Sequence, residues 1–476
     1  MQAEARSARR TAASRVEKTQ IALVLAIVAW GALSFGAVYP WGYAPLGGAS
    51  ALAGALGLLA GQRRRVPRLV VAAGAVVVGS IVVQLVPLSS SVLARLSPAT
   101  VALLDRYDVM FALARGSAVH TLSVDSRRTW IGVMLIASLG TFWLGLTAML
   151  RTRLVLWIVR GLVIVGTGIA VIGVIAPSGH DARIYGFWQP QSAATSFGPF
   201  VNRNHYAGWM LMTIPLGVSY LWSLLARDTA ARSWRARLSW LSTPSASGLI
   251  LLGVALAVMV LSVVMSLSRS GIGCLVVSLT LLVCVVDRTR VSWWRRAILA
   301  TCVAGVVAAC IGWTGTDRIG GRFAESQTDR LGGRVGVWRD ASAVARAFPL
   351  TGTGFNTFSV AMLFYQTHDL EEFYAEAHSD YLQVGAEGGL LVGIPALALM
   401  LVTAREVRRR FSGDDPRSYS LRLGAVAGLL AIALQETIEF SLQMPGNAAL
   451  FCVLAAIALY HPDRHGAGSL QLRPAA

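Results

Sequence analysis

Long apolar runs alternate with short polar segments along most of this chain. Most of the runs are long enough for an α-helix, at about 1.5 Å per residue, to cross a hydrocarbon layer of about 30 Å. The pattern predicts twelve membrane-spanning helices, near residues 20–38, 43–61, 69–87, 129–149, 156–176, 204–226, 248–268, 271–287, 297–315, 388–404, 421–439 and 446–461. No cleavage pattern of a signal peptide precedes the first run, so we expect this run to remain as a span.

Composition also indicates a membrane protein. Of the 476 residues, 55% are hydrophobic and only 14% are charged, whereas about a quarter of the residues of a soluble domain are charged. The cysteines all fall inside predicted spans, at Cys274, Cys284, Cys302, Cys310 and Cys452. They form no CxxC pair, so a disulfide framework is not expected. We expect an all-α integral membrane protein with about 12 transmembrane helices, in which one membrane domain at 20–461 lies between tails at 1–19 and 462–476.

The formal net charge of +18 would suit a nucleic-acid partner, but the distribution of the charge indicates a topology instead. Basic residues gather in the N-terminal segment and in alternate loops, which read QRRRVPR, RTR, RDTAARSWRAR, DRTRVSWWRR and REVRRRFSGDDPR. An excess of Lys and Arg marks the cytoplasmic side of a membrane protein. Both termini are therefore predicted to be cytoplasmic. The basic side chains are expected to contact membrane lipid, and no nucleic-acid partner is expected.

The opposite, outward side of the membrane is predicted to carry three substantial loops. The first, at about 88–128, is expected to hold a short surface helix and then a strand-like or irregular segment, and the second, at about 177–203, is expected to be irregular. The longest loop, at 316–387, contains GRVGVWRDASAVARAFPL with helical spacing and then the glycine-rich turn TGTGFNTF. The stretch DLEEFYAEAHSDYLQVGAE is predicted to form a second helix that runs into the next span.

The end of this long loop reads AHSDYLQVGAEGG and places four polar side chains ahead of an apolar run. On the predicted helix, His378 lies on one face, and Asp380, Gln383 and Glu387 lie on the adjoining face. Charged groups are costly in hydrocarbon, so they normally pair or face water. A helix end that only reaches the membrane interface, with His378 hydrogen-bonded, is the simpler interpretation. The polar segments elsewhere on the outward side favour a site.

Three further polar segments belong to this side: FVNRNHYAGW, LSRSG and GGRVGVWRD. The candidate binding residues in them are Arg203, Asn204, His205, Arg269, Arg334, Trp338 and Arg339. Arg269 falls in a very short turn between two spans, so we expect it to be held near the outer interface. Arginine is always charged and offers a bidentate fork to phosphate, which favours a phosphate-bearing ligand. Ordinary solvation in a loop is the alternative for each arginine taken singly.

These segments follow one another in an order and spacing that resemble a known family. VNRNHYAG, SLSRSG, GGRVGVW, GTGFNTF and AHSDYLQVGAEGG resemble the O-antigen ligase and O-antigen polymerase superfamily, and ETIEFSLQMPGNAALF resembles its C-terminal span. The resemblance covers about 195–460. It implies a bacterial inner-membrane glycosyltransferase with a GT-C-like helical fold and a periplasmic active site. It also implies a glycan donor on undecaprenyl diphosphate, with lipid A–core as the acceptor of a ligase or a second lipid-linked glycan as the acceptor of a polymerase.

The resemblance further implies roles for single residues. His378 is implied to be the catalytic base, and Arg269 and Arg334 are implied to bind the diphosphate. This fits the chemistry, because a histidine can accept the proton of a sugar hydroxyl and fixed guanidinium groups stabilise a departing diphosphate. The other candidate substrate-binding residues are Arg203, Asn204, His205, Trp338, Asp380, Gln383 and Glu387. Glu387 is expected either to orient His378 or to pair with an arginine.

Some alternatives stay open at this point. A transporter or flippase would also have about twelve spans, but transporters place charged residues at the membrane midplane. Here the polar clusters lie at the outer ends of the runs, with Glu436 and Glu439 near the outer end of the eleventh run as the nearest exceptions. A divalent ion held by His205, His378 and a carboxylate is a second alternative. The resemblance implies a metal-independent enzyme without a cofactor. The pattern SDYLQ departs from many ligases, so the acceptor is not fixed.

Overall fold

The computed structural model describes residues 2–61, 66–114, 116–176, 183–190, 195–225, 243–285, 301 and 330–462. In this part of the chain, eight helices are long and apolar enough to cross a membrane. They are α1 (Gln2–Leu33), α2 (Pro40–Ala60), α7 (Ser126–Met149), α8 (Thr152–Ile175), α9 (Arg203–Leu225), α11 (Pro244–Met265), α17 (Asp380–Phe411) and α18 (Pro416–Gln435). The expected all-α membrane fold is confirmed.

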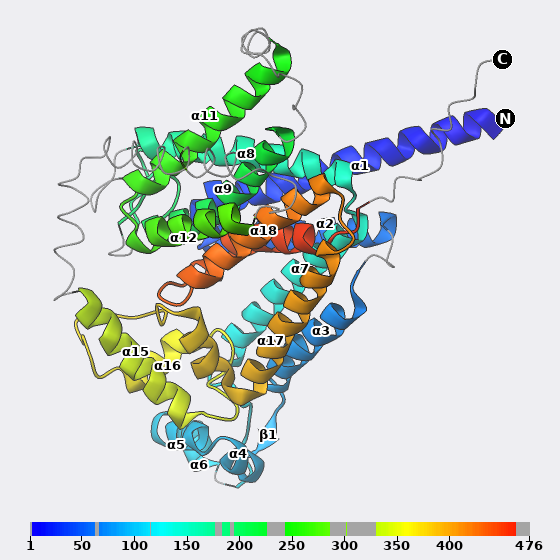
Figure 1. Ribbon diagram of the computed structural model, residues 1–476. Coiled ribbons are helices and arrows are strands. Elements are labelled where there is room, and N and C mark those ends of the chain that lie inside the picture. The colour runs from blue at the N-terminus through cyan, green and yellow to red at the C-terminus, as the bar shows by residue number, and fades with distance from the viewer. Residues whose placement is uncertain are drawn as a thin grey trace, which may run out of the picture.

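Three shorter apolar helices match further predicted runs. They are α3 (Arg68–Val83), α12 (Arg269–Val285) and α19 (Pro445–Leu459). The predicted run at 297–315 lies outside the described residues, so the number of twelve spans stays a prediction. The helical bundle packs α2 against α7, α9 against α18 and α1 against α19 (Figure 1). Glycines allow several of these close approaches, since a Cβ on Gly31 would collide with the backbone of Gly446.

The smaller elements gather at one end of the bundle (Figure 1). The loop expected at 88–128 forms β1 (Leu88–Ser89), α4 (Ser90–Leu96), α5 (Pro98–Tyr107), α6 (Val109–Leu113) and β2 (Val119–His120), with β1 and β2 antiparallel. The described parts of the loop at 177–203 hold only isolated bridges, as expected for an irregular segment. The long loop contributes α15 (Arg330–Ala347), which confirms the first predicted helix, and the unpredicted α16 (Phe358–Tyr365).

The second predicted helix in the long loop is partly wrong. Residues 366–379 are not helical, and α17 begins only at Asp380. The backbone before α17 is held by side chains instead of by helical hydrogen bonds. The side-chain oxygen Oε1 of Gln383 accepts from the Ala377 N–H at 2.9 Å. His378 has a φ of 51°, in the left-handed region that a right-handed helix excludes. His378 therefore lies in a turn and not on a helix face.

A break at Gly389 divides α17 into a short outer part and a long membrane part. Gly389 has a φ of 52°, which interrupts the helical hydrogen bonds and is tolerated because glycine has no Cβ. The carbonyls of Ala386 and Glu387 accept instead from the N–H groups of Thr353 and Gly354, both at 3.0 Å. The loop that follows α15 thus crosses α17 at the break and satisfies the backbone groups that the break leaves open.

Gln84, at the C-terminal end of α3, locks this crossing. Its fully buried side chain donates to the carbonyls of Thr351 and Glu387 at 2.7 and 2.8 Å, and it accepts from the Phe355 N–H at 3.0 Å. Packing of α3 alongside α17 brings these partners together. The outer part of α17 is therefore attached to α3 and to the 349–355 loop, and this attachment fixes the position of the turn that carries His378.

Candidate functional site

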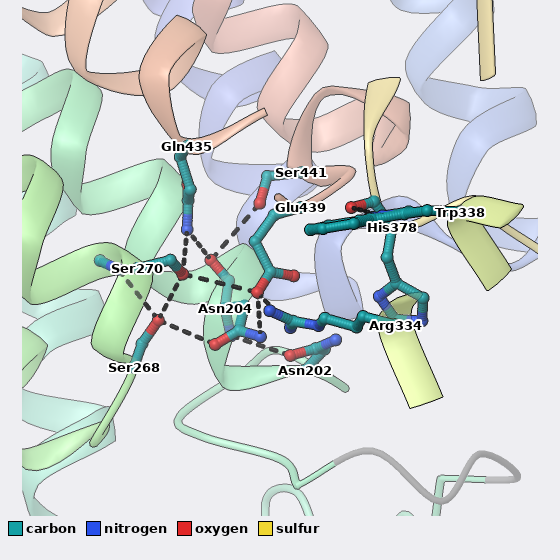
Figure 2. A network of polar contacts seen from close by, with 11 residues as sticks. Asn202, Asn204, Ser268, Ser270, Arg334, Trp338, His378, Gln435, Glu439 and Ser441 are labelled. Carbon is teal, nitrogen blue, oxygen red and sulfur yellow. Dashed lines mark hydrogen bonds and ion pairs between the residues drawn. The ribbon is translucent and has the colours of Figure 1, made fainter. Parts of the chain in front are cut away.

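Five separated parts of the sequence converge at one end of the bundle. They are the N-terminus of α9, the N-terminus of α12, the helix α15, the turn before α17, and the segment between α18 and η3 (Ser441–Gln443). Figure 2 shows a network of polar contacts around Glu439 that joins α9, α12, α15 and the segment after α18, with Trp338 and His378 bonded to each other beside it. The polar segments that the sequence singled out on the outward side therefore do meet in space, although they are up to about 240 positions apart in the chain.

Glu439 lies at the centre of this network. Its carboxylate oxygen Oε1 accepts from Arg334 Nη2 at 2.6 Å, from Asn204 Nδ2 at 2.7 Å and from the Ser270 hydroxyl at 3.5 Å. The Glu439 side chain is 1% exposed and that of Arg334 is 29% exposed, so the ion pair joins a buried anion to a partly accessible cation. Burial raises the pKa of Glu439, while Arg334, Asn204 and Ser270 each oppose the rise.

Asn204 connects α9 to α12 and to the end of α18. Its side-chain oxygen accepts from the Ser268 hydroxyl at 2.8 Å, and its backbone carbonyl accepts from Gln435 Nε2 at 3.0 Å. The side chain of Asn202 accepts from the Asn204 N–H at 2.8 Å and so satisfies one of the free N–H groups at the start of α9. The amide of Asn204 is thus held in one orientation toward Glu439.

His378 lies beside Arg334 at the edge of the network (Figure 2). Trp338 Nε1 donates to the His378 carbonyl at 3.4 Å, and the imidazole meets the Phe440 ring edge-to-face at 4.9 Å. The ring nitrogen Nδ1 is buried and has no hydrogen-bond partner among the described residues. Burial, followed by the positive charge of Arg334, lowers the pKa of His378 to about 4. The ring is therefore neutral at ordinary pH, with a nitrogen that can accept a proton.

His205 and His378 both contact the ring of Phe440. The His205 imidazole meets the Phe440 ring at 4.6 Å, again edge-to-face. His205 is buried in α9, and its backbone carbonyl accepts from Asn447. Its contacts are with the protein interior, so its predicted role in substrate binding stays a hypothesis.

Gln383 and Glu387 hold the turn before α17 in place through hydrogen bonds. The Gln383 amide donates to Glu376 at 2.7 Å, to Gln443 at 3.0 Å and to Glu387 at 3.2 Å. Glu387 accepts from the N–H groups of Asn356 and Phe358 at 2.8 and 2.9 Å. These contacts differ from the two roles that the sequence suggested for Glu387, since they tie the 356–358 segment to α17 instead of reaching a histidine or an arginine.

Asp380 pairs with a second carboxyl group. Its N–H donates to the Glu436 carbonyl at 3.1 Å, and its Oδ1 accepts from Gln443 at 2.7 Å. Burial, and then the negative charge of Asp380, raises the pKa of Glu436 to about 10. Glu436 therefore keeps a proton at neutral pH and can share it with Asp380. The contacts of these two residues hold the end of α18 against the start of α17.

Arg269 and Arg203 lie at helix starts next to the network, whereas Arg339 lies within α15. Arg269 is the first residue of α12, half-buried and placed between Ser268 and Ser270, and the residue before this serine pair, Leu267, has a φ of 53°. Arg203 is the first residue of α9, and its N–H donates to the Thr195 carbonyl. The tight turn that the sequence predicted around Arg269 is therefore present, at the end of the bundle where Glu439 lies.

Sequence reasoning missed several members of the network. They are Asn202, Ser268, Ser270, Gln435, Phe440 and Ser441, and the central position of Glu439 was also not predicted. Glu439 carried a signal, because it is an ionisable group near the polar end of an apolar run. In the described ranges, no group of three or more His, Cys, Asp or Glu side chains could hold a metal ion. Independence from metal stays a prediction, which activity after chelation would test.

The fold and the network define an all-α membrane protein with a polar, arginine-containing site at the helix ends. A sequence model of the O-antigen ligase family matches residues 254–397. This match confirms the resemblance to the O-antigen ligase and polymerase superfamily. No curated protein matches the chain.

The matched segment contains much of the candidate site, with Asn204 and Glu439 outside it. It includes Arg269, Arg334 and His378. The family indicates a glycosyltransferase-like enzyme of the O-antigen ligase or polymerase type in a bacterial inner membrane, with lipid-linked glycan and lipid A–core as its general partners.

Proposed function

We propose that this protein transfers a glycan from undecaprenyl diphosphate to a sugar hydroxyl at the periplasmic face of the inner membrane. The observation that carries the proposal is the side-by-side placement of a neutral, half-buried imidazole and an arginine held by a buried carboxylate, at one end of the helical bundle. A base next to an anion-binding cation is what displacement of a diphosphate by a hydroxyl requires.

In the proposed step, the acceptor oxygen attacks the anomeric carbon of the donor glycan. The C–O bond to the diphosphate breaks, and undecaprenyl diphosphate leaves with the electron pair. His378 takes the hydroxyl proton on its neutral imidazole. No metal or nucleotide sugar enters this scheme, because the leaving group is already a diphosphate.

Arg334 and Arg269 are proposed to bind the diphosphate. Glu439 holds the Arg334 guanidinium in place, and Ser270 links the start of α12 to the same carboxylate. An incoming diphosphate would compete with Glu439 for Arg334. Holding the side chain in advance lowers the entropy cost of ordering it when the donor binds.

The acceptor is either lipid A–core or a second lipid-linked glycan. Both present a sugar hydroxyl to the same base, so the site chemistry is shared by a ligase and a polymerase. The surface-glycan pattern of a deletion strain separates the two. Unattached lipid-linked polymer indicates a ligase, and single repeat units attached to the core indicate a polymerase.

The test of the proposal is glycan transfer in vitro by purified variants, together with binding of a lipid-diphosphate analogue. His378→Ala is expected to reduce transfer about 10²–10⁴-fold and to leave donor binding largely intact. His368→Ala is the matched control, since His368 lies in the same outward region and pairs with Asp340 instead of with the network. Normal transfer by His378→Ala would contradict the assignment. Transport of lipid-linked glycan without any transfer would favour a flippase.

A further inference from the structure

A large apolar groove opens between α8, α9 and α11, away from the candidate site. Its volume is about 1040 Å³, near the upper end of the roughly 300–1,000 Å³ that is usual for small-molecule sites. It reaches α9 at Tyr220 and Leu224. Tyr220 is 17 positions beyond Arg203 on the continuous helix α9, which corresponds to roughly 25 Å at about 1.5 Å per residue. The groove is therefore at the opposite end of α9 from the network around Glu439.

Among the described residues that line this groove, the charged side chain is that of Arg160. Arg160 Nε donates to the Tyr220 hydroxyl at 2.7 Å, and its guanidinium lies 5.4 Å from the centre of the Trp157 ring and 5.9 Å from that of Tyr220. No acidic side chain in the described ranges forms an ion pair with it. A guanidinium within a membrane span is costly unless an anion or water accompanies it.

The walls of the groove leave room for a long apolar chain. Its other lining residues are Val163, Ile164, Thr167, Gly168, Val171, Leu249, Leu251 and Leu252, with Gly248 and Ala255. The Thr167 hydroxyl donates to its own helix, at the Val163 carbonyl, so it adds no free donor to the wall. A Cβ on Gly168 or on Gly248 would meet no atom within 4 Å, which means that both glycines face open space.

We propose that this groove is a binding site for an acidic phospholipid of the leaflet that faces away from the candidate site. The phosphate binds the Arg160 guanidinium, and one acyl chain lies along α8 against α11. The donor's diphosphate is not the proposed occupant, because Arg160 is too far along the bundle from Arg334 and Arg269 for one headgroup to reach both.

The first test measures phosphatidylglycerol binding to the purified full-length protein by native mass spectrometry in detergent. Arg160→Gln is expected to weaken binding about tenfold or more, because a charge-assisted hydrogen bond is lost. Arg153→Gln is the matched control: Arg153 lies on the same helix, is exposed, and does not line the groove. Phosphatidylcholine is expected to bind more weakly, with no dependence on Arg160. Equal phosphatidylglycerol binding by the two variants would overturn the site.

A second pair of variants tests the groove without changing its charge. Gly168→Leu would place a side chain in the open space and is expected to displace phosphatidylglycerol to a similar extent. Gly140→Leu on α7 is its control, since a side chain there also meets open space but lies outside the groove. Unchanged binding by Gly168→Leu would overturn the acyl-chain position. If undecaprenyl phosphate displaces phosphatidylglycerol from the parent protein and binds more tightly, the occupant is the prenyl lipid and the proposed phospholipid is wrong.

Discussion

The pH dependence of glycan transfer tests the proposed role of His378 most directly. Burial, and then the charge of Arg334, lowers the pKa of His378 from its ordinary 6.5 to about 4. Protonating the buried ring therefore costs roughly 3 kcal/mol more than protonating a histidine in water, at about 1.36 kcal/mol for each pH unit. A base must be neutral to accept a proton, and this ring is neutral well below pH 6.5.

We therefore expect kcat/KM for transfer to stay flat from neutral pH down to about pH 5 and to fall only near pH 4, because kcat/KM reports the free enzyme. The acid limb of kcat is expected at a higher pH, since the bound diphosphate brings negative charge close to the imidazole and favours its protonated form. Arg334→Gln is expected to move the limb of kcat/KM upward only in part, because burial is the larger cause of the lowered pKa.

The same lowered pKa has a consequence for stability, and its sign can be stated. Below pH 6.5 His378 binds a proton in the unfolded chain but not in the folded protein. The free energy of unfolding therefore decreases as the pH falls from 6.5 toward about 4. His378→Phe is expected to remove this contribution, and His368→Phe serves as its control. An acid limb of kcat/KM at pH 6–7 in the parent protein, or an unchanged pH profile in His378→Asn with activity retained, would refute the reasoning.

Three further outcomes are expected. Glu439→Gln removes the buried charge but keeps a polar side chain, so it is expected to leave the protein folded and to reduce transfer about tenfold or more by releasing Arg334; transfer by Glu439→Gln at the parent rate would mean that Glu439 does not position Arg334. Gln84→Leu leaves the Thr351 carbonyl and the Phe355 N–H without a partner, while the Glu387 carbonyl keeps the Gly354 N–H, and it is expected to destabilise the protein by about 2 kcal/mol or more, seen as a lower Tm in detergent; an unchanged Tm would contradict the role given to the crossing. Arg269→Ala is expected to weaken both donor binding and transfer, with partial rescue by Arg269→Lys, because an ammonium lacks the bidentate fork; normal binding and transfer by Arg269→Ala would make this arginine structural.

The apolar runs gave the membrane fold because the length and period of a span are local properties of the sequence. The convergence of the outward polar segments was also predictable, since charges that cannot remain in hydrocarbon collect at helix ends. The turn at His378 was not predictable from periodicity. Gln383, which bonds to Ala377 six positions before it, and Trp338, forty positions from His378, hold the turn in a conformation that no local pattern encodes.

The centre of the site was missed for a related reason. Glu439 lies at the outer end of the eleventh run, where the sequence marks it only as an exception among nearly uncharged spans. Its partners come from three other helices, at Arg334, Asn204 and Ser270. A single sequence gives the positions of such groups along the chain but not their distances across the bundle, so the pairing became visible only in three dimensions.

The break at Gly389 has a mechanical consequence for the enzyme. A continuous helix transmits tilt and rotation along its whole length, so a span that shifts in the bilayer would drag any catalytic group at its end. In α17 the helical conformation is interrupted at Gly389, so tilt and rotation of the long membrane part are not transmitted to the two turns before the break. These two turns are attached to Gln84 and to the 349–355 loop. The long membrane part can therefore accommodate changes in bilayer thickness while the imidazole keeps its register with Arg334.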